Sequence, residues 1–242
     1  IFGYLLETHA LKRSILQVAT GLIRQRKLPL VLDLDDTLVR LVSDDVAGSN
    51  KYVPVAIAER YAQDRIRMLS DGRRVVVAPG VDEFLDWAKA KFEMSVCSVG
   101  DAKYVRGVCE VLDAGCNRIG PLRHSARAEH DYLDQKLRTL RSLNLPVPTR
   151  DGLPPPPKHL GVLYPFVHMP TCGDGSIRKE DWYGLPLIMD DQTRSWPPEQ
   201  HGNIVVMEEK DPVEHMPFNL DLQVARGILE ELHKTWFASW DA

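Results

Sequence analysis

The sequence predicts an α/β fold built on a doubly wound parallel sheet that carries a helical, proline-rich insertion. Short and almost wholly apolar runs, such as residues 28–32, are typical of strands buried on both faces of a parallel sheet. These runs alternate with amphipathic helical patterns, as at residues 81–92, and this alternation is the mark of the α/β class. The composition, with 44% hydrophobic and 26% charged residues, excludes the disordered and collagen-like classes.

The predicted elements follow one another in the order that such a fold requires. Residues 1–26 place apolar side chains at three-and-four spacing among basic ones, which predicts an amphipathic helix flanking the main domain. The first strand is predicted at 28–32. Further strands are predicted at 75–77, 94–98, 187–189 and 204–207, and further helices at 81–92, 104–112, 133–143 and 222–236.

The alternation breaks between residues 117 and 175. Six of the 17 prolines fall at 146–157, where they exclude a helix or a central strand. We therefore expect an insertion at about 117–175, made of a helix and a stiff polyproline-like loop, within a single domain that spans residues 27–242.

Charge and cysteine usage exclude several functional classes. The formal net charge of −4 argues against a broadly basic coat for direct nucleic-acid binding. The four cysteines show no CxxC spacing, so neither a zinc ribbon nor a disulfide framework is indicated. The uncharged stretch from Ser14 to Ile23 is too short to span a membrane. Because the first residue is Ile1, we expect the chain to be a fragment.

Polar side chains gather at the carboxyl ends of three predicted strands, where ligands bind in open α/β sheets. Two carboxylates on alternate residues after a buried strand are costly unless they bind a cation or take part in chemistry. A second carboxylate pair completes an oxygen-rich site of the kind that Mg²⁺ prefers, and hydroxyl groups suit phosphate oxygens. The pattern indicates metal-assisted phosphoryl chemistry. The side chains concerned are Asp33, Asp35, Thr37, Ser98, Asp190 and Asp191.

Residues 31–39, which read VLDLDDTLV, match the DxDxT signature of the haloacid dehalogenase-type phosphatases. The chain resembles in particular the branch of the TFIIF-associating (FCP/SCP) type, which dephosphorylates the C-terminal domain of RNA polymerase II. Ser98 stands where that branch has threonine. The resemblance implies a haloacid dehalogenase-like (Rossmannoid) fold, with residues 27–242 forming the phosphatase domain. The other matching stretches are 26–28, 78–85, 97–100, 188–196 and 228–237.

The resemblance implies a role for each carboxylate. Asp33 is implied to be the nucleophile that forms an aspartyl-phosphate, and Asp35 to be the general acid and base. The implied cofactor is Mg²⁺, held by Asp33, the main-chain carbonyl of Asp35 and Asp191. Asp190 is implied to orient the metal-bound water and a lysine.

The remaining candidate residues carry more than one interpretation. Thr37 and Ser98 are expected to contact the phosphate or to hold the loop, and Ser98 also fits a plain turn at a strand end. We place the site lysine at Lys179, which precedes the strand that leads into Asp190, with Arg178 as the alternative. Both are expected to bind substrate, whereas a purely structural interpretation makes Lys179 a solvated surface charge.

The function that follows from the resemblance is a Mg²⁺-dependent protein serine/threonine phosphatase. Its implied substrate is the phosphorylated C-terminal tail of RNA polymerase II, which implies a nuclear location and possible transcription-factor partners, without direct nucleic-acid or membrane binding. Two alternatives stay open: a phosphatase of another phosphoprotein or of a small metabolite, and a non-catalytic phosphopeptide-binding scaffold. Turnover of phosphorylated peptides against small phosphate esters separates them.

Overall fold

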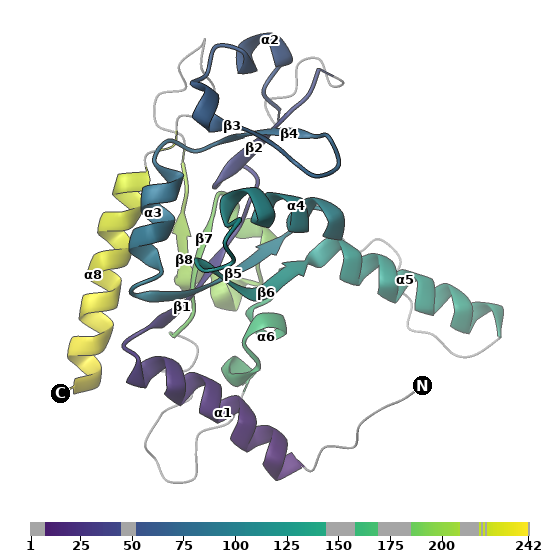
Figure 1. The fold of residues 1–242 in the computed structure, drawn as a ribbon. Helices are drawn as coiled ribbons and strands as arrows, with labels where there is room; N and C mark the ends of the chain where they lie inside the picture. The colour runs from purple at the N-terminus through teal and green to yellow at the C-terminus, as the bar shows by residue number, and fades with distance from the viewer. Residues whose placement is uncertain are drawn as a thin grey trace.

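The computed structural model describes residues 8–44, 52–143, 158–168, 185–208, 218, 220 and 222–241. Its centre is a parallel sheet of five strands in the order β6-β5-β1-β7-β8. Helices flank this sheet, so the predicted α/β class is confirmed (Figure 1). The strands are β1 (Leu28–Leu32), β5 (Phe92–Ser98), β6 (Ile119–Ser125), β7 (Leu187–Asp190) and β8 (Ile204–Val206).

Each of the predicted helices is present, with shifted bounds at α3 and α5, whereas the short helices α2 and α6 were not predicted. The helix expected at residues 1–26 is α1, and it is described from Thr8 to Arg24. In Figure 1 the helices α3 and α8 lie side by side, and α5 projects away from the sheet. No helix in the described part of the chain is long and apolar enough to cross a membrane. The other helices are α3 (Val81–Ala88), α4 (Ala102–Leu112), α5 (Ala126–Ser142), the short α6 (Leu160–Leu163) and α8 (Leu222–Asp241).

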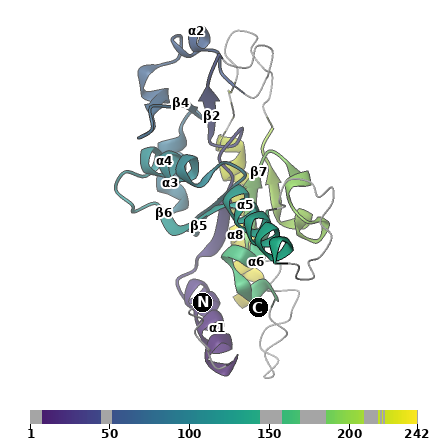
Figure 2. The ribbon, with the colours of Figure 1, turned by 90° about the vertical axis from the view of Figure 1, so that its right-hand side faces the viewer.

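A second, smaller sheet corrects one expectation. The run at 75–77 is a strand, but it does not belong to the parallel sheet. It forms part of β4 (Arg74–Val77), which pairs antiparallel with β2 (Val39–Val42) and β3 (Ile66–Met68). The turn between β3 and β4 is too short for a parallel crossover, and Gly72 adopts a φ of 88° within it. The small sheet and α2 (Val55–Ala58) lie at one end of the molecule, and α1 lies at the other (Figures 1 and 2).

The expected insertion at 117–175 is divided between different parts of the fold. Residues 119–125 form β6, an edge strand of the main sheet, because the chain after α4 returns alongside β5. Residues 126–142 form α5, which contains most of the predicted helix at 133–143. The proline-rich stretch lies outside the described residues, and the chain returns to the core from Lys158 onward.

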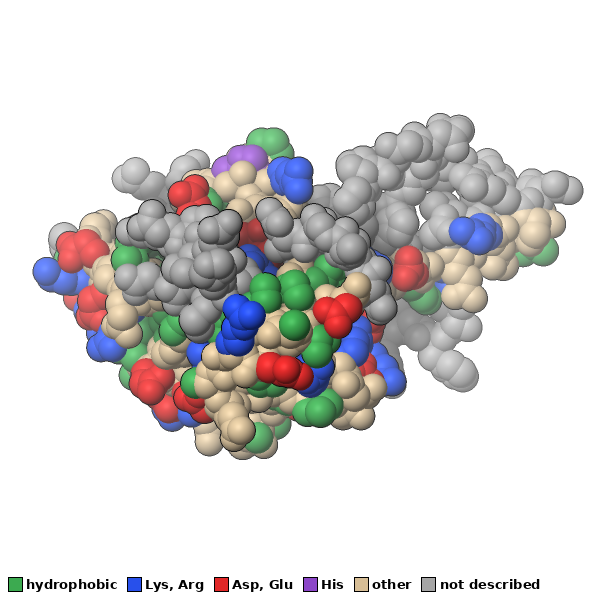
Figure 3. Space-filling view, turned by 90° about the horizontal axis from the view of Figure 1, so that it is seen from above, with side chains coloured by type: hydrophobic (Ala, Val, Ile, Leu, Met, Phe, Trp, Pro, Cys, Tyr) green, Lys and Arg blue, Asp and Glu red, His purple; other side chains and the backbone are tan. Residues whose placement is uncertain are grey.

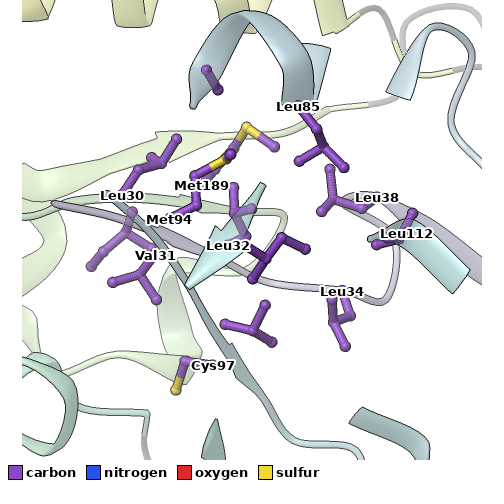
Figure 4. Packing of buried hydrophobic residues seen from close by; sticks show 14 of the residues in the cluster. Leu30, Val31, Leu32, Leu34, Leu38, Leu85, Met94, Cys97, Leu112 and Met189 are labelled. Atoms are coloured by element: carbon purple, nitrogen blue, oxygen red, sulfur yellow. The ribbon is translucent and has the colours of Figure 1, made fainter. Parts of the chain in front are cut away.

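The core explains why β1 occupies the middle of the sheet. All five of its residues are buried, with β5 on one side and β7 on the other. Leu30 pairs with Met94, and Leu32 with Met189, and these apolar side chains pack together (Figure 4). Each buried leucine contributes about 1.5–3 kcal/mol relative to an exposed one. The packing fixes the end of β1 and therefore the position of the residue that follows it.

The surface carries charges of both signs. Seen from above, the acidic and basic side chains are interspersed, without a broad basic area on the described part of this face (Figure 3). This distribution agrees with the mildly acidic composition of the chain.

Candidate active site

The carboxyl ends of β1, β5 and β7 meet, as the parallel order requires, and a pocket of about 300 Å³ opens beside them. Asp33 follows β1 directly, and its main-chain N–H donates to the carbonyl of Met189 in β7 at 2.9 Å. This bond joins the end of β1 to the strand that ends in Asp190. The pocket brings together four of the predicted residues, namely Asp33, Asp35, Asp190 and Asp191.

The loop after β1 is held by its own backbone. The carbonyl of Leu34 accepts hydrogen bonds from the N–H groups of Leu38 and Val39, both at 2.9 Å. Asp36 adopts a left-handed φ of 59°, a conformation that aspartate tolerates better than most residues. Its carboxylate is fixed by the guanidinium of Arg40, with Nε and Oδ1 2.5 Å apart. The loop therefore presents Asp33 and Asp35 on a rigid support.

The cation of the site is a residue that sequence reasoning missed. The Nζ atom of Lys158 lies 2.6 Å from Asp33 Oδ1 and 2.7 Å from Asp190 Oδ2, and its side chain is 2% exposed. Burial lowers the pKa of Lys158, but the two carboxylates outweigh burial and raise the pKa above its ordinary value. Lys158 therefore keeps its positive charge at neutral pH.

The predicted lysine, Lys179, and its alternative, Arg178, lie outside the described residues. Lys158 was overlooked because it follows directly on four prolines, within a stretch assigned to the insertion. One signal was present in the sequence: after Lys158 the chain turns apolar at Leu160 and Leu163, which indicates a return to the core.

Asp190 forms the buried base of the site, where hydrogen bonds hold its carboxylate in place. Its side chain is fully buried, and Oδ1 accepts a hydrogen bond from the Gln192 N–H at 2.7 Å. Oδ2 accepts from Lys158 Nζ and from the indole Nε1 of Trp196, both at 2.7 Å. Both oxygens of Asp190 are thus engaged by protein donors, and the residue holds Lys158 in place.

Asp191 faces the pocket and has fewer partners. Its Oδ2 accepts one hydrogen bond, from the side-chain amide of Gln192 at 3.1 Å. Burial raises the pKa of Asp191 to about 6, and the neighbouring Asp190 and Asp36 add to the rise. This surplus of negative charge is what a bound cation would neutralise.

The acidic cluster fits a metal ion. One carboxylate oxygen from each of Asp33, Asp190 and Asp191 lies within 4.8 Å of the others. Because both oxygens of Asp190 already accept hydrogen bonds, Asp33 and Asp191 are the side chains that would hold the ion. Oxygen donors of this kind suit a hard cation. Burial raises the pKa of Asp33 well above its usual range, and Lys158 opposes that rise, as a metal ion would.

The carboxyl group of Asp35 is bonded to Tyr104, whereas those of Asp33 and Asp190 are bonded to Lys158. Its Oδ1 accepts a hydrogen bond from the phenol hydroxyl of Tyr104 in α4, at 2.5 Å. Burial raises the pKa of Asp35, while the hydrogen bond from Tyr104 lowers it. Burial also raises the pKa of Tyr104 well above its usual value, and the nearby Asp35 adds to this, so the phenol keeps its proton and remains the donor.

Thr37 and Ser98 are fully buried, and neither lines the pocket. The Oγ atom of Ser98 accepts a hydrogen bond from the Gly100 N–H at 3.0 Å, which closes the turn after β5. The hydroxyl of Thr37 has no hydrogen-bond partner among the described residues. Of the two roles expected for these side chains, Ser98 shows a contact that holds the loop.

We compared the chain with known protein families and with solved structures. Residues 28–147 match the family model described as NLI interacting factor-like phosphatase. Over this segment, just under half of the chain, the protein is similar to the NLI interacting factor-like phosphatases. The family resemblance expected from the sequence is thereby confirmed. No protein of curated function matches the chain.

The fold of this chain is similar to that of solved structures. One is the structure of Fcp1, an essential RNA polymerase II CTD phosphatase, with a TM-score of 0.51, 16% identity and coverage of 94% of this chain and 53% of that one. Another is a variant of fission yeast RNA polymerase II CTD phosphatase Fcp1 bound to beryllium fluoride, with a TM-score of 0.51 and 15% identity, covering 94% and 54%. The chain thus spans about half the length of these structures.

The fold completes the phosphatase domain beyond the segment that the family model matches. The match ends at residue 147, before Lys158, Asp190 and Asp191, yet β7 and α6 bring these residues to Asp33. Phosphatases of this group use a metal ion, and the acidic cluster offers the carboxylate oxygens that such an ion binds. The site therefore combines a buried carboxylate, a charged lysine and an oxygen-rich cluster.

Proposed function

We propose that the chain is a Mg²⁺-dependent protein serine/threonine phosphatase that works through an aspartyl-phosphate on Asp33. The observation that carries the proposal is the position of Asp33: its side chain is buried at the strand end, 2.6 Å from Lys158, and it lines the same pocket as Asp35 and Asp191. A binding module has no need of a nucleophile beside an acid, whereas hydrolysis requires both.

The first step transfers the phosphoryl group to the protein. A carboxylate oxygen of Asp33 forms a bond to phosphorus, and the bond from phosphorus to the serine or threonine oxygen breaks. The electron pair of that bond goes to the leaving oxygen, which takes the proton of the Asp35 carboxyl. Lys158 contributes positive charge beside the transferred group, where negative charge is spread over the phosphoryl oxygens.

The second step returns the enzyme to its starting state. The Asp35 carboxylate accepts a proton from water while the water oxygen bonds to phosphorus. The bond between phosphorus and Asp33 breaks, its electron pair returns to the Asp33 carboxylate, and inorganic phosphate leaves. Asp33 and Asp191 would hold a Mg²⁺ ion here, which would neutralise part of the negative charge of the phosphoryl group. Asp35 ends the cycle protonated again.

The proposed substrate is the phosphorylated C-terminal tail of RNA polymerase II. Support comes from the family and from the Fcp1 structures, whose stated activity is dephosphorylation of that tail. The pocket is also compatible with a peptide, since Leu41, Tyr52 and Val99 add apolar surface beside the charged residues. A nuclear location and contact with transcription factors belong to this proposal.

The decisive experiment is a Mg²⁺-dependent assay on singly phosphorylated heptad peptides, sugar phosphates and p-nitrophenyl phosphate. We expect turnover of the peptides above that of the sugar phosphates, and a loss of at least about a thousandfold in Asp33→Asn, because the amide cannot attack phosphorus. Glu199→Gln, on the surface away from the pocket, is the matched control. Preference for a sugar phosphate would favour the metabolite alternative, and hydrolysis that persists in Asp33→Asn would exclude the proposed nucleophile.

A further inference from the structure

The hydrogen bond between Asp35 and Tyr104 is not used in the mechanism above, and it suggests a further role. Backbone hydrogen bonds fix the main chain of the loop after β1, but they leave the Asp35 carboxyl free to rotate about its side-chain bonds. The phenol hydroxyl of Tyr104 is its hydrogen-bond partner in the described part of the chain, at 2.5 Å from Oδ1. One contact therefore decides how the carboxyl is oriented.

Three contacts hold Tyr104 in place. Its main-chain N–H donates to Oδ1 of Asp101, the residue that caps α4, at 2.8 Å. Gly100 lies so close that an added Cβ would come within 2.5 Å of the Tyr104 ring, so only glycine leaves room for the ring. The guanidinium of Arg73 lies over the ring, 4.9 Å from its centroid.

Arg73 is in turn fixed to the small sheet and to α4. Its guanidinium lies 2.6 Å from the carboxylate of Asp71 and 3.4 Å from that of Asp101. Arg73 and Asp71 belong to the turn between β3 and β4, whereas Tyr104 belongs to α4. Contacts from the small sheet and from its own helix therefore both hold the ring of Tyr104 in place. Rigid support of this kind is what holds a reacting group within the small tolerance that catalysis allows.

We propose that Tyr104 is a positioning residue that orients the Asp35 carboxyl for proton transfer to the leaving oxygen of the substrate. The inference rests on the proposed function and extends it. Tyr104 binds Oδ1, which leaves Oδ2 to carry the proton. In the first step that proton passes from Oδ2 to the leaving oxygen, and in the second step Oδ2 takes a proton from water. The phenol donates to Oδ1 throughout and transfers no proton.

The leaving group provides a test that a purely structural role would not satisfy. A phosphoserine peptide expels an alkoxide-like oxygen and needs the proton, whereas p-nitrophenyl phosphate expels a stable phenolate and hardly needs it. In Tyr104→Phe we expect kcat on the phosphoserine peptide to fall about 10- to 100-fold, a part of the usual contribution of a general acid. On p-nitrophenyl phosphate we expect a fall of no more than about threefold, with KM for both substrates within about twofold of wild type.

Three further variants complete the experiment. Asp35→Asn should show the same dependence on the leaving group with a larger loss, and adding Tyr104→Phe to it should cause no further loss, because the two residues act as a unit. Gly100→Ala should reproduce the Tyr104→Phe pattern by displacing the ring. Tyr164→Phe is the matched control, since it removes another buried hydroxyl, which bonds to Ser95 Oγ at 3.1 Å. It should leave the ratio of the two rates unchanged.

The outcomes separate this inference from the proposed function. If wild type hydrolyses both substrates through Asp33 but Tyr104→Phe loses activity equally on both, the positioning role is overturned and the proposed function stands. The positioning role is overturned in the same way if the double variant Tyr104→Phe/Asp35→Asn loses activity by the full product of the two single losses. Absence of Asp33-dependent hydrolysis in wild type would overturn the proposed function, and this inference with it. A selective loss on the phosphoserine peptide supports both.

Discussion

At the residue scale, the site is organised by a single cation between two buried carboxylates. Lys158 lies within 2.7 Å of both Asp33 and Asp190, and the lysine and Asp190 are almost inaccessible to water. Buried ions of this kind are costly to desolvate, and the fold tolerates them because each neutralises the other. The arrangement places charge where phosphoryl transfer needs it, and the packing of β1 and β7 provides the necessary stability.

Removal of this cation should destabilise the protein as well as inactivate it. In Lys158→Met, two carboxylates remain buried without a counter-charge, and we expect the free energy of unfolding to fall by about 3–5 kcal/mol. Urea denaturation in EDTA measures this loss. The double variant Lys158→Met/Asp190→Asn should recover part of it, because one of the stranded charges is then absent. A loss below about 1 kcal/mol in the single variant would contradict the buried ion pair.

The sequence identified the carboxylates because their pattern is local. Asp33 and Asp35 alternate after an apolar run, and Asp190 and Asp191 follow another, so each pair can be recognised from its neighbours. Tyr104 lies in the helix predicted at 104–112 and is buried there, but its hydroxyl partner is 69 positions away in the sequence. Long-range contacts of this type leave no periodicity that a single sequence can show.

At the element scale, α8 combines strong packing with one weak position. Leu229 and Phe237 of this helix are buried against the domain. Gly227 lies two residues before Leu229 in the same helix, and a Cβ added there would meet no atom within 4 Å. Glycine inside a helix gives the unfolded chain more freedom without a compensating contact in the folded state.

Gly227→Ala should therefore stabilise the protein. We expect a gain of about 0.5–1 kcal/mol in the free energy of unfolding, the usual difference between alanine and glycine in a helix interior. Gly202→Ala is the matched control: the new methyl group would also meet no atom within 4 Å, but the position lies outside any α-helix. Urea titration compares the two, and a loss of stability in Gly227→Ala would show that α8 packs more closely at this position than described.

The two sheets show that the sequence can predict individual strands but not which strands pair with one another. The apolar run at 75–77 has the same appearance as the strands of the main sheet, but it pairs with β2 and β3 instead. Strand pairing depends on what lies beside a strand in space, and the polar loop after residue 42 gave no sign of a separate sheet. Residues 119–125 were missed as a strand for a related reason, since Gly120, Pro121 and the polar pair Arg123 and His124 interrupt the apolar pattern.

At the scale of the whole molecule, the metal site links ligand binding to global stability. Asp33 and Asp191 come from different strands, and these strands come together only in the folded chain. An ion that binds the folded state alone raises the free energy of unfolding by about 2.7 kcal/mol at one hundred times its Kd. Folding and metal binding are therefore coupled.

This coupling gives a prediction for the intact chain. Saturating Mg²⁺ should raise the melting temperature relative to EDTA at equal ionic strength, because the ion binds the folded state and not the unfolded one. Asp191→Asn should abolish most of the shift, since the variant loses one of the two side chains that hold the ion. Scanning calorimetry with and without Mg²⁺ measures the effect in each protein. An equal shift in wild type and variant would place the ion elsewhere.

The central position of β1 also determines when an active molecule first exists during synthesis. A ribosome makes β1 before its partner strand β7, which begins only at Leu187. Until then one side of β1 is an open edge, with Leu30 and Leu32 available to any other exposed strand, and such edges promote aggregation. The nascent chain lacks Asp190 and Asp191 for the same period. The acidic cluster and the protected edge of β1 therefore form together, when β7 joins the sheet.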